Sequence, residues 1–123
     1  MAYQWLKSVF ARLLAQNCAL CRAPAGDYAL CPDCLQELPY NQPACSRCAI
    51  GMPQPGVCGA CLQRPRPFTA AIAPLRWQPP VDYLLHLFKY QHHLEIGVVL
   101  GELLADQVLQ QDIELPELLL PTP

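Results

Sequence analysis

Eight cysteines constrain this chain more than any other feature of its sequence, because all of them lie between residues 18 and 61. They form four C-x2-C pairs, and the last two pairs repeat the first two at an offset of 27 residues. A two-residue spacing lets a tight turn bring both thiolates of a pair onto one metal ion. The pattern therefore predicts a duplicated C-x2-C-x9-C-x2-C unit, each copy supplying the four ligands of one tetrahedral zinc ion. The predicted ligands are Cys18, Cys21, Cys31, Cys34, Cys45, Cys48, Cys58 and Cys61.

The grouping of these ligands has two possible forms. In the sequential form, one zinc ion takes the four cysteines of residues 18–34 and the other takes those of residues 45–61. In a cross-braced form, the first pair joins the third and the second pair joins the fourth. We favour the sequential form, because one copy of a repeat is normally one structural unit. Four protein ligands leave no position open for water or substrate, so we predict two structural Zn2+ ions and no catalytic residue at either.

Disulfide bonds, iron binding and redox catalysis explain the eight cysteines less well than zinc binding does. A disulfide framework belongs to secreted chains, and the first 17 residues lack a signal-peptide layout because Lys7 and Arg12 interrupt the apolar stretch. Four thiolates can also bind iron. A catalytic C-x-x-C motif needs one pair beside a βαβ pattern rather than four pairs in a repeat. Many thiols without an export signal predict a cytoplasmic protein.

The net charge bears on the partners to expect. The formal charge is −2, and two zinc ions with four thiolates each bring it to about −6. A nucleic-acid-binding domain normally shows a basic face. One interpretation is a small basic patch at Arg64 and Arg66; the interpretation that we favour is solvated surface arginines beside anionic zinc centres. Large hydrophobic residues are few between residues 18 and 61, so we expect this segment to depend on its metal for folding.

The flanking segments carry helix and strand patterns. Residues 3–16 predict an amphipathic helix, which we expect to pack on the protein rather than to anchor it at a membrane surface. Residues 62–67 form a proline-stiffened connector. Residues 68–78 predict a strand that Pro74 bends or places at a sheet edge, and a later predicted helix runs over about residues 94–111. The first helix after the strand begins at the proline pair, and the apolar face expected on it consists of Val81, Leu84, Leu85 and Phe88.

The spacing places no Asp or Glu beside His86, His92 or His93, so we interpret them as surface or loop-end residues rather than as acid–base or metal groups. No apolar run approaches the roughly twenty residues that span a bilayer.

Four cysteine pairs followed by Pro-Phe-Thr-Ala-Ala-Ile-Ala, and then by Pro-Pro-Val-Asp-Tyr-Leu-Leu-His-Leu-Phe-Lys-Tyr, resemble the ComF/GntX family over residues 18–123. The resemblance implies a double zinc ribbon before a type I phosphoribosyltransferase-like domain, and a role in competence, as DNA uptake, or in DNA utilisation. The phosphate loop that such a domain uses, acidic residues followed by Thr-Thr-Gly, does not occur in this sequence. We therefore expect a non-catalytic module without cofactor-binding residues other than the zinc ligands.

Two alternatives remain open for the function. The chain is part of a phosphoribosyltransferase whose phosphoribosyl pyrophosphate site lies beyond its end, or it is a protein-interaction zinc ribbon. The partners that the resemblance implies are single-stranded DNA or proteins of a DNA-uptake machine, with no membrane span.

The expected fold class is small metal-bound zinc ribbons with short β-hairpins plus a partial α/β region. The expected divisions are an N-terminal amphipathic helix at 1–17, a double zinc ribbon at 18–66, and the start of a truncated phosphoribosyltransferase-like domain at 67–123. Because most of the sheet of such a domain is absent here, we expect several apolar side chains to be partly exposed. These are Leu84, Leu85, Leu87, Phe88 and Leu103.

Overall fold

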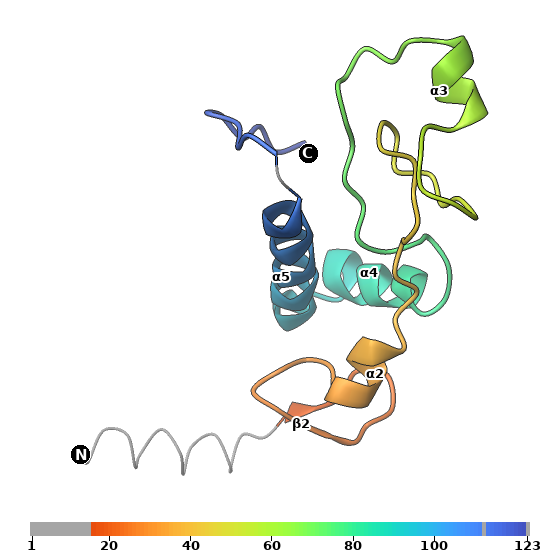
Figure 1. Cartoon of the computed structure of the whole chain (residues 1–123). Coiled ribbons are helices and arrows are strands. Elements are labelled where there is room, and N and C mark those ends of the chain that lie inside the picture. The colour runs from red at the N-terminus through yellow and green to blue at the C-terminus, as the bar shows by residue number, and fades with distance from the viewer. Residues whose placement is uncertain (1–15, 112, 123) are drawn as a thin grey trace.

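The structure, a computed structural model, describes residues 16–111 and 113–122. The predicted N-terminal helix therefore lies outside the described residues, apart from its last position. The elements, in chain order, are β1 (Gln16–Asn17), β2 (Pro24–Gly26), α2 (Pro32–Gln36), α3 (Gly59–Gln63), α4 (Val81–Tyr90) and α5 (Leu94–Gln110), as Figure 1 shows. Strands β1 and β2 pair antiparallel and form a small hairpin beside the first cysteine group. Short cysteine-bearing ribbons followed by two helices fit the predicted fold class.

The duplication seen in the sequence is also present in the backbone. Helices α2 and α3 are five residues long and lie 27 positions apart. The residue before each is a cysteine with nearly the same backbone angles, φ −73° and ψ 160° at Cys31 and φ −70° and ψ 157° at Cys58. Arg22 and Ala49, also 27 positions apart, both have a positive φ, at 65° and 59°. The two copies of the sequence therefore fold into the same local structure.

Helices α4 and α5 occupy the two segments that the sequence predicts as helices, and they pack against each other as a helical hairpin. Pro80 precedes α4, and its fixed φ is compatible with a helix start. The first ribbon, residues 16–38, lies against this hairpin, and the two parts share one hydrophobic core (Figure 1). Leu30 from the ribbon is 1% exposed, and Leu84 and Ile96 from the hairpin are 0% exposed. The buried members of this core are Cys18, Ala25, Ala29, Leu30, Cys31, Leu38, Leu84, Leu87, Ile96 and Val99.

This shared core corrects one expectation. We expected Leu84 and Leu87 to be partly exposed, but they are 0% and 6% exposed. The reason is that the first ribbon covers the α4–α5 hairpin on a face that a sheet was expected to cover. Leu85, Phe88 and Leu103 are half-buried, in agreement with the expectation.

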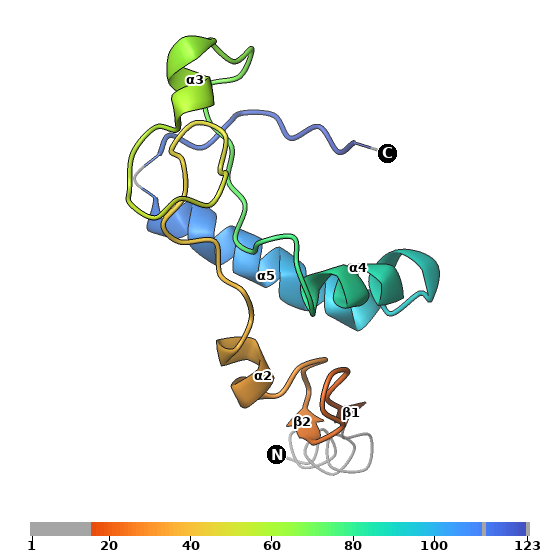
Figure 2. The ribbon, with the colours of Figure 1, turned by 90° about the vertical axis from the view of Figure 1, so that its right-hand side faces the viewer.

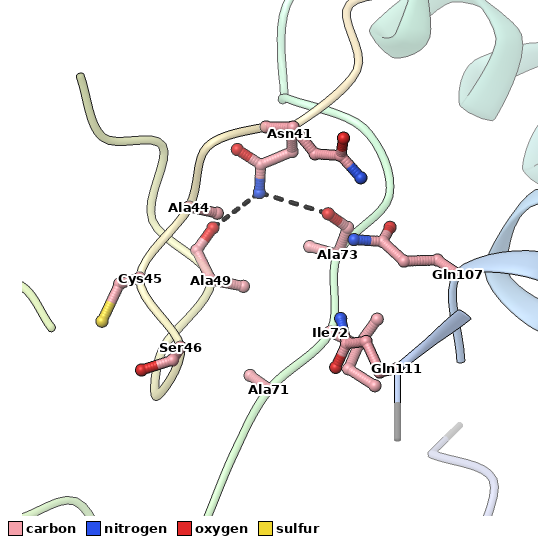
Figure 3. A pocket seen from close by; sticks show the side chains of 11 residues that line it. Asn41, Ala44, Cys45, Ser46, Ala49, Ala71, Ile72, Ala73, Gln107 and Gln111 are labelled. Atoms are coloured by element: carbon pink, nitrogen blue, oxygen red, sulfur yellow. Dashed lines mark hydrogen bonds between the residues drawn. The ribbon is translucent and has the colours of Figure 1, made fainter. Parts of the chain in front are cut away.

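The second ribbon, residues 41–63, lies on the far side of the hairpin from the first ribbon, as Figure 1 and the rotated view in Figure 2 show. Asn41 joins it to the segment 68–78, which follows the connector. The Asn41 side-chain N–H group donates to the carbonyl of Ala49, at 2.6 Å, and to that of Ala73, at 3.2 Å (Figure 3). Asn41 is 3% exposed, which makes it a buried polar clamp between two irregular segments.

The strand predicted over residues 68–78 is wrong as a regular strand. The segment is extended, but its ladder pairing is limited to one bridge between Leu75 and Tyr40. The backbone N–H of Arg76 donates to Pro39, at 2.8 Å, and that of Asn41 donates to Pro74, at 2.9 Å. A strand needs a neighbour along its length, and the short stretch around Tyr40 supplies one at only this point.

The packing of α4 on α5 generates a prediction at Gly97. A Cβ atom at Gly97 would overlap the ring of Phe88, whereas a Cβ atom at Gly101 would meet nothing within 4 Å. We expect Gly97→Ala to lower the free energy of unfolding by about 1–3 kcal/mol, because the overlap outweighs the better helix propensity of alanine. The matched control Gly101→Ala should raise it by up to about 1 kcal/mol. Urea titrations of the zinc-loaded chain measure both, and a Gly97→Ala chain as stable as the control would contradict this packing.

Candidate metal centres

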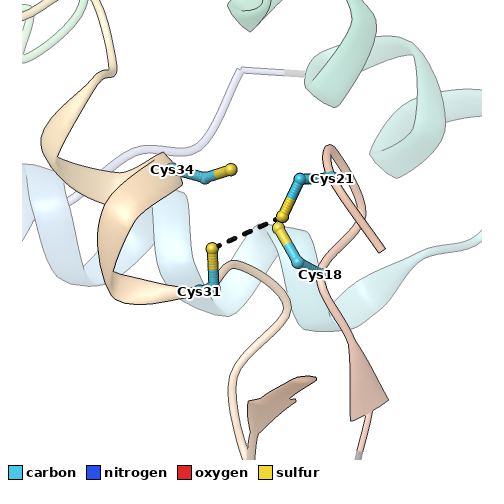
Figure 4. A group of neighbouring side chains, drawn as sticks. All are labelled: Cys18, Cys21, Cys31 and Cys34. Carbon is cyan, nitrogen blue, oxygen red and sulfur yellow. Dashed lines mark hydrogen bonds between the residues drawn. The ribbon is translucent and has the colours of Figure 1, made fainter. Parts of the chain in front are cut away.

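The first cysteine group is built from the β1 end, the turn after it and helix α2. The Sγ atoms of Cys18, Cys21, Cys31 and Cys34 all lie within 4.8 Å of one another (Figure 4). The turn is closed by the backbone N–H of Arg22, which donates to the carbonyl of Cys18 at 2.9 Å. The Sγ atoms of Cys21 and Cys31 are 3.6 Å apart.

The second cysteine group repeats this geometry. The Sγ atoms of Cys45, Cys48, Cys58 and Cys61 also lie within 4.8 Å of one another. The Sγ atoms of Cys48 and Cys58, which are the equivalents of Cys21 and Cys31, are 3.7 Å apart. The backbone N–H of Cys58 donates to the Cys45 sulfur at 3.3 Å. Each group thus takes its cysteines from one copy of the repeat, which is the sequential grouping.

The sulfur separations fit zinc. Four sulfurs at about 2.3 Å from a tetrahedral zinc ion have edges of about 3.8 Å, close to the 3.6 and 3.7 Å found here. A disulfide needs sulfurs about 2 Å apart, and all eight cysteines are free thiols. The geometry therefore favours metal ligation over the disulfide alternative.

The first cysteine of each copy is held as a thiolate. Burial disfavours the charged form of Cys18, but backbone N–H groups of Cys21 and Cys31 outweigh it and lower the pKa of Cys18 to about 6. Backbone N–H groups of Cys48 and Cys58 lower the pKa of Cys45 to about 6 in the same way. A thiolate is the form of cysteine that binds a metal. One ready ligand is therefore present in each group at neutral pH.

Other cysteines of both groups resist ionisation. Burial and the other three sulfurs of its group raise the pKa of Cys34. The Ile50 backbone acts to lower the pKa of Cys48, but burial and the neighbouring sulfurs raise it to about 11. Four thiolates packed this closely repel one another unless a cation lies between them. The donor set thus has the charge, number and spacing that one divalent, thiophilic ion matches.

A group with four protein ligands has no open coordination position, so its zinc ion acts in folding and not in chemistry. When bound, each ion ties its two cysteine turns together and neutralises half of the thiolate charge. Cys18 and Cys31 lie inside the core shared with the α4–α5 hairpin. The first site is therefore part of that core.

A cation lies beside the second group. Contact with the Cys61 thiol raises the pKa of the Arg66 guanidinium, and the charges of Cys48 and Cys58 act in the same direction. Arg66 is one of the two residues at which the sequence permitted a small basic patch. Its position next to the sulfurs means that part of the anionic charge of this site is balanced within the chain.

The histidines differ from expectation in one respect. His93 Nδ1 lies 2.6 Å from Glu95 Oε1, so the prediction that no acidic residue accompanies the histidines is wrong. The His93 imidazole lowers the pKa of Glu95, as does the N-terminal backbone of α5. The sequence pattern missed this pair because residues two apart do not share a face of a helix, and His93 is the residue directly before α5. Asn41 was missed as well, since a single Asn in a loop carries no periodic pattern.

No helix among the described residues is long and apolar enough to cross a membrane.

The different surroundings of the two sites generate a second prediction. Cys18→Ser and Cys45→Ser should each lower the zinc content from two ions to one per chain, because each removes one ligand of one group. Only Cys18→Ser should also loosen the α4–α5 hairpin, because Cys18 belongs to its core. Native mass spectrometry reads the zinc content, and hydrogen exchange of the α4 and α5 amides reads the loosening. Equal loss of protection in both variants would contradict the shared core.

Comparison with known proteins agrees with this geometry. Residues 9–62 match the model of the double zinc ribbon domain. The chain is 28% identical over 113 residues to the DNA utilization protein YhgH of Salmonella typhimurium, covering 86% of this chain and 50% of that protein. It is 30% identical over 95 residues to the Salmonella typhi protein of the same name, covering 75% of this chain and 42% of that protein. Identity to the protein of that name in Escherichia coli K12 is 28% over 113 residues, with coverages of 86% and 50%.

The chain thus spans about half the length of the curated relatives it matches. No solved structure matches it significantly. The domain match, the repeat and the two groups of four free thiols agree with one another. We conclude that the chain contains a double zinc ribbon domain that holds two structural zinc ions.

Proposed function

We propose that this chain is the non-catalytic, zinc-dependent module of a ComF/GntX-family protein that acts in the uptake or utilisation of DNA. Relatives named as DNA utilization proteins align with 86% of the chain, a span that includes both the ribbons and the helical hairpin. The similarity to these relatives is the observation that carries the role in DNA use. The zinc-dependent part of the proposal rests on the core shared by the first zinc site and the α4–α5 hairpin. Zinc in this arrangement organises the two helices that pack against the first ribbon.

The non-catalytic part of the proposal rests on the chemistry of the side chains. Both sulfur groups are complete with protein ligands, and His93 is engaged with Glu95. A phosphoribosyltransferase needs a Gly-rich or Thr-rich phosphate loop at a helix N-terminus, and this sequence has none. The enzymatic alternative must therefore place its substrate site in the half of the relatives that this chain does not span.

The compartment and the partners follow from the same chemistry. Zinc-bound thiolates persist where thiols are kept reduced, so we place the protein in the cytoplasm. Its partners there are DNA or the proteins that deliver DNA. A pure protein-interaction ribbon remains the competing function, and it differs in requiring no contact with nucleic acid.

Growth on DNA tests the proposal. A strain from which the gene of this protein is deleted should lose growth on purified DNA as the carbon source and keep normal growth on glucose. The intact gene should restore growth, whereas the Cys18→Ser gene should not, because the core that depends on the first zinc site is lost. A deletion strain that grows on DNA at the parental rate would contradict the proposed function.

A further inference from the structure

The charges of the chain are sorted by position. Between residues 38 and 81 the sequence has no Asp or Glu and four arginines. These four, at positions 47, 64, 66 and 76, are all exposed. The first ribbon differs, since residues 16–37 carry one arginine and three acidic residues. Residues 38–81, which include the second ribbon and the connector, are therefore the basic part of an otherwise acidic chain.

Part of this basic segment forms a shallow hollow on the surface. It is lined by Arg47, from the turn between two zinc-binding cysteines, by Arg66 from the connector, and by Phe68 directly after the connector. Phe68 is 45% exposed, although a large aromatic side chain normally gains by burial. Pro65 and Pro67 line the same hollow and restrict the backbone on either side of Arg66. A ring and two guanidinium groups are thus held at one place by a stiff segment and a metal-bound turn.

This surface is not used to build the core of the described residues. The hydrophobic cluster that joins the first ribbon to the hairpin contains no residue of the second ribbon. Helix α3 buries only Cys61, whereas Leu62 beside it is 72% exposed. The two copies of the repeat therefore differ in their surroundings: the first is packed into the protein and the second presents its side chains to solvent.

The charge balance of this part of the chain is positive. A zinc ion with four thiolates carries −2, and the four arginines outweigh it. In the first ribbon the same metal charge adds to a side-chain excess of acidic residues. The second ribbon therefore attracts an anionic polymer, and the first ribbon repels it.

We propose that the hollow lined by Arg47, Arg66 and Phe68 binds single-stranded DNA, with the guanidinium groups on phosphates and an unstacked base on the Phe68 ring. The choice of DNA rests on the proposed function; the anionic, base-bearing character of the ligand rests on the side chains. Guanidinium groups with an exposed ring are the combination that single-strand binding uses, because every base has a face that stacks. In duplex DNA the bases are paired and stacked on one another, so no base face is available to stack on the Phe68 ring. A protein partner has no regularly spaced phosphates for two separate arginines to bind.

Fluorescence anisotropy with a labelled 20-nucleotide oligo-dT and the full, zinc-loaded chain tests this proposal. Arg47→Gln should weaken binding and make the negative slope of log K against log salt shallower by about 0.7, the change expected for one lost phosphate contact on a single strand. Phe68→Ala should weaken binding about 5- to 100-fold and leave that slope unchanged, because stacking involves no counterion. Arg22→Gln on the first ribbon is the matched control and should leave the affinity for oligo-dT unchanged.

Arg66→Gln should act like Arg47→Gln, and native mass spectrometry must show two zinc ions in this variant, since Arg66 lies beside Cys61. Absence of oligo-dT binding at 20 mM salt, equal binding of duplex DNA, or equal losses in Arg22→Gln and Arg47→Gln would overturn the proposal. These outcomes are separable from the growth test. Growth that depends on the gene without oligo-dT binding refutes this surface alone, and oligo-dT binding without a growth defect refutes the proposed function alone.

Discussion

Repulsion among closely packed thiolates is the constraint on which this structure depends. Four sulfurs within 4.8 Å of one another are stable as a group when a cation lies between them. Backbone N–H groups hold the first cysteine of each copy as a thiolate, while burial and neighbouring sulfurs keep Cys34 and Cys48 protonated without metal. Zinc resolves this conflict, so metal binding and folding of the ribbons are one process.

The two copies of the repeat place the same sulfur cage in different surroundings. In the first copy, Cys18 and Cys31 are packed with Leu84 and Ile96, so the metal site is continuous with the hydrophobic core. The second copy is joined to the 68–78 segment by the buried amide of Asn41 and leaves its arginines exposed. Duplication of a metal-stabilised unit thus provides one copy that stabilises its neighbours and one whose arginines lie on the surface.

The sequence allowed the local features to be predicted and not their packing. The 27-residue offset indicated both cysteine groups and their equivalence, because ligand spacing is a local property. The helices also followed from apolar periodicity and a proline start: α4 begins directly after the proline pair, and α5 begins and ends within one residue of the predicted positions. The burial of Leu84 could not be predicted, since it depends on a ribbon more than 40 residues earlier in the chain. The 68–78 strand failed for a related reason: strand formation depends on a partner, and no local pattern supplies one.

Two zinc ions, each held by one copy of the repeat, hold this chain together. Native mass spectrometry of the chain, purified without chelators, is the sharpest test. We expect two zinc ions per chain and, after acid removes them, a mass with all eight cysteines as thiols. A metal-free chain whose mass shows the cysteines joined as disulfides, yet whose fold is intact, would contradict it.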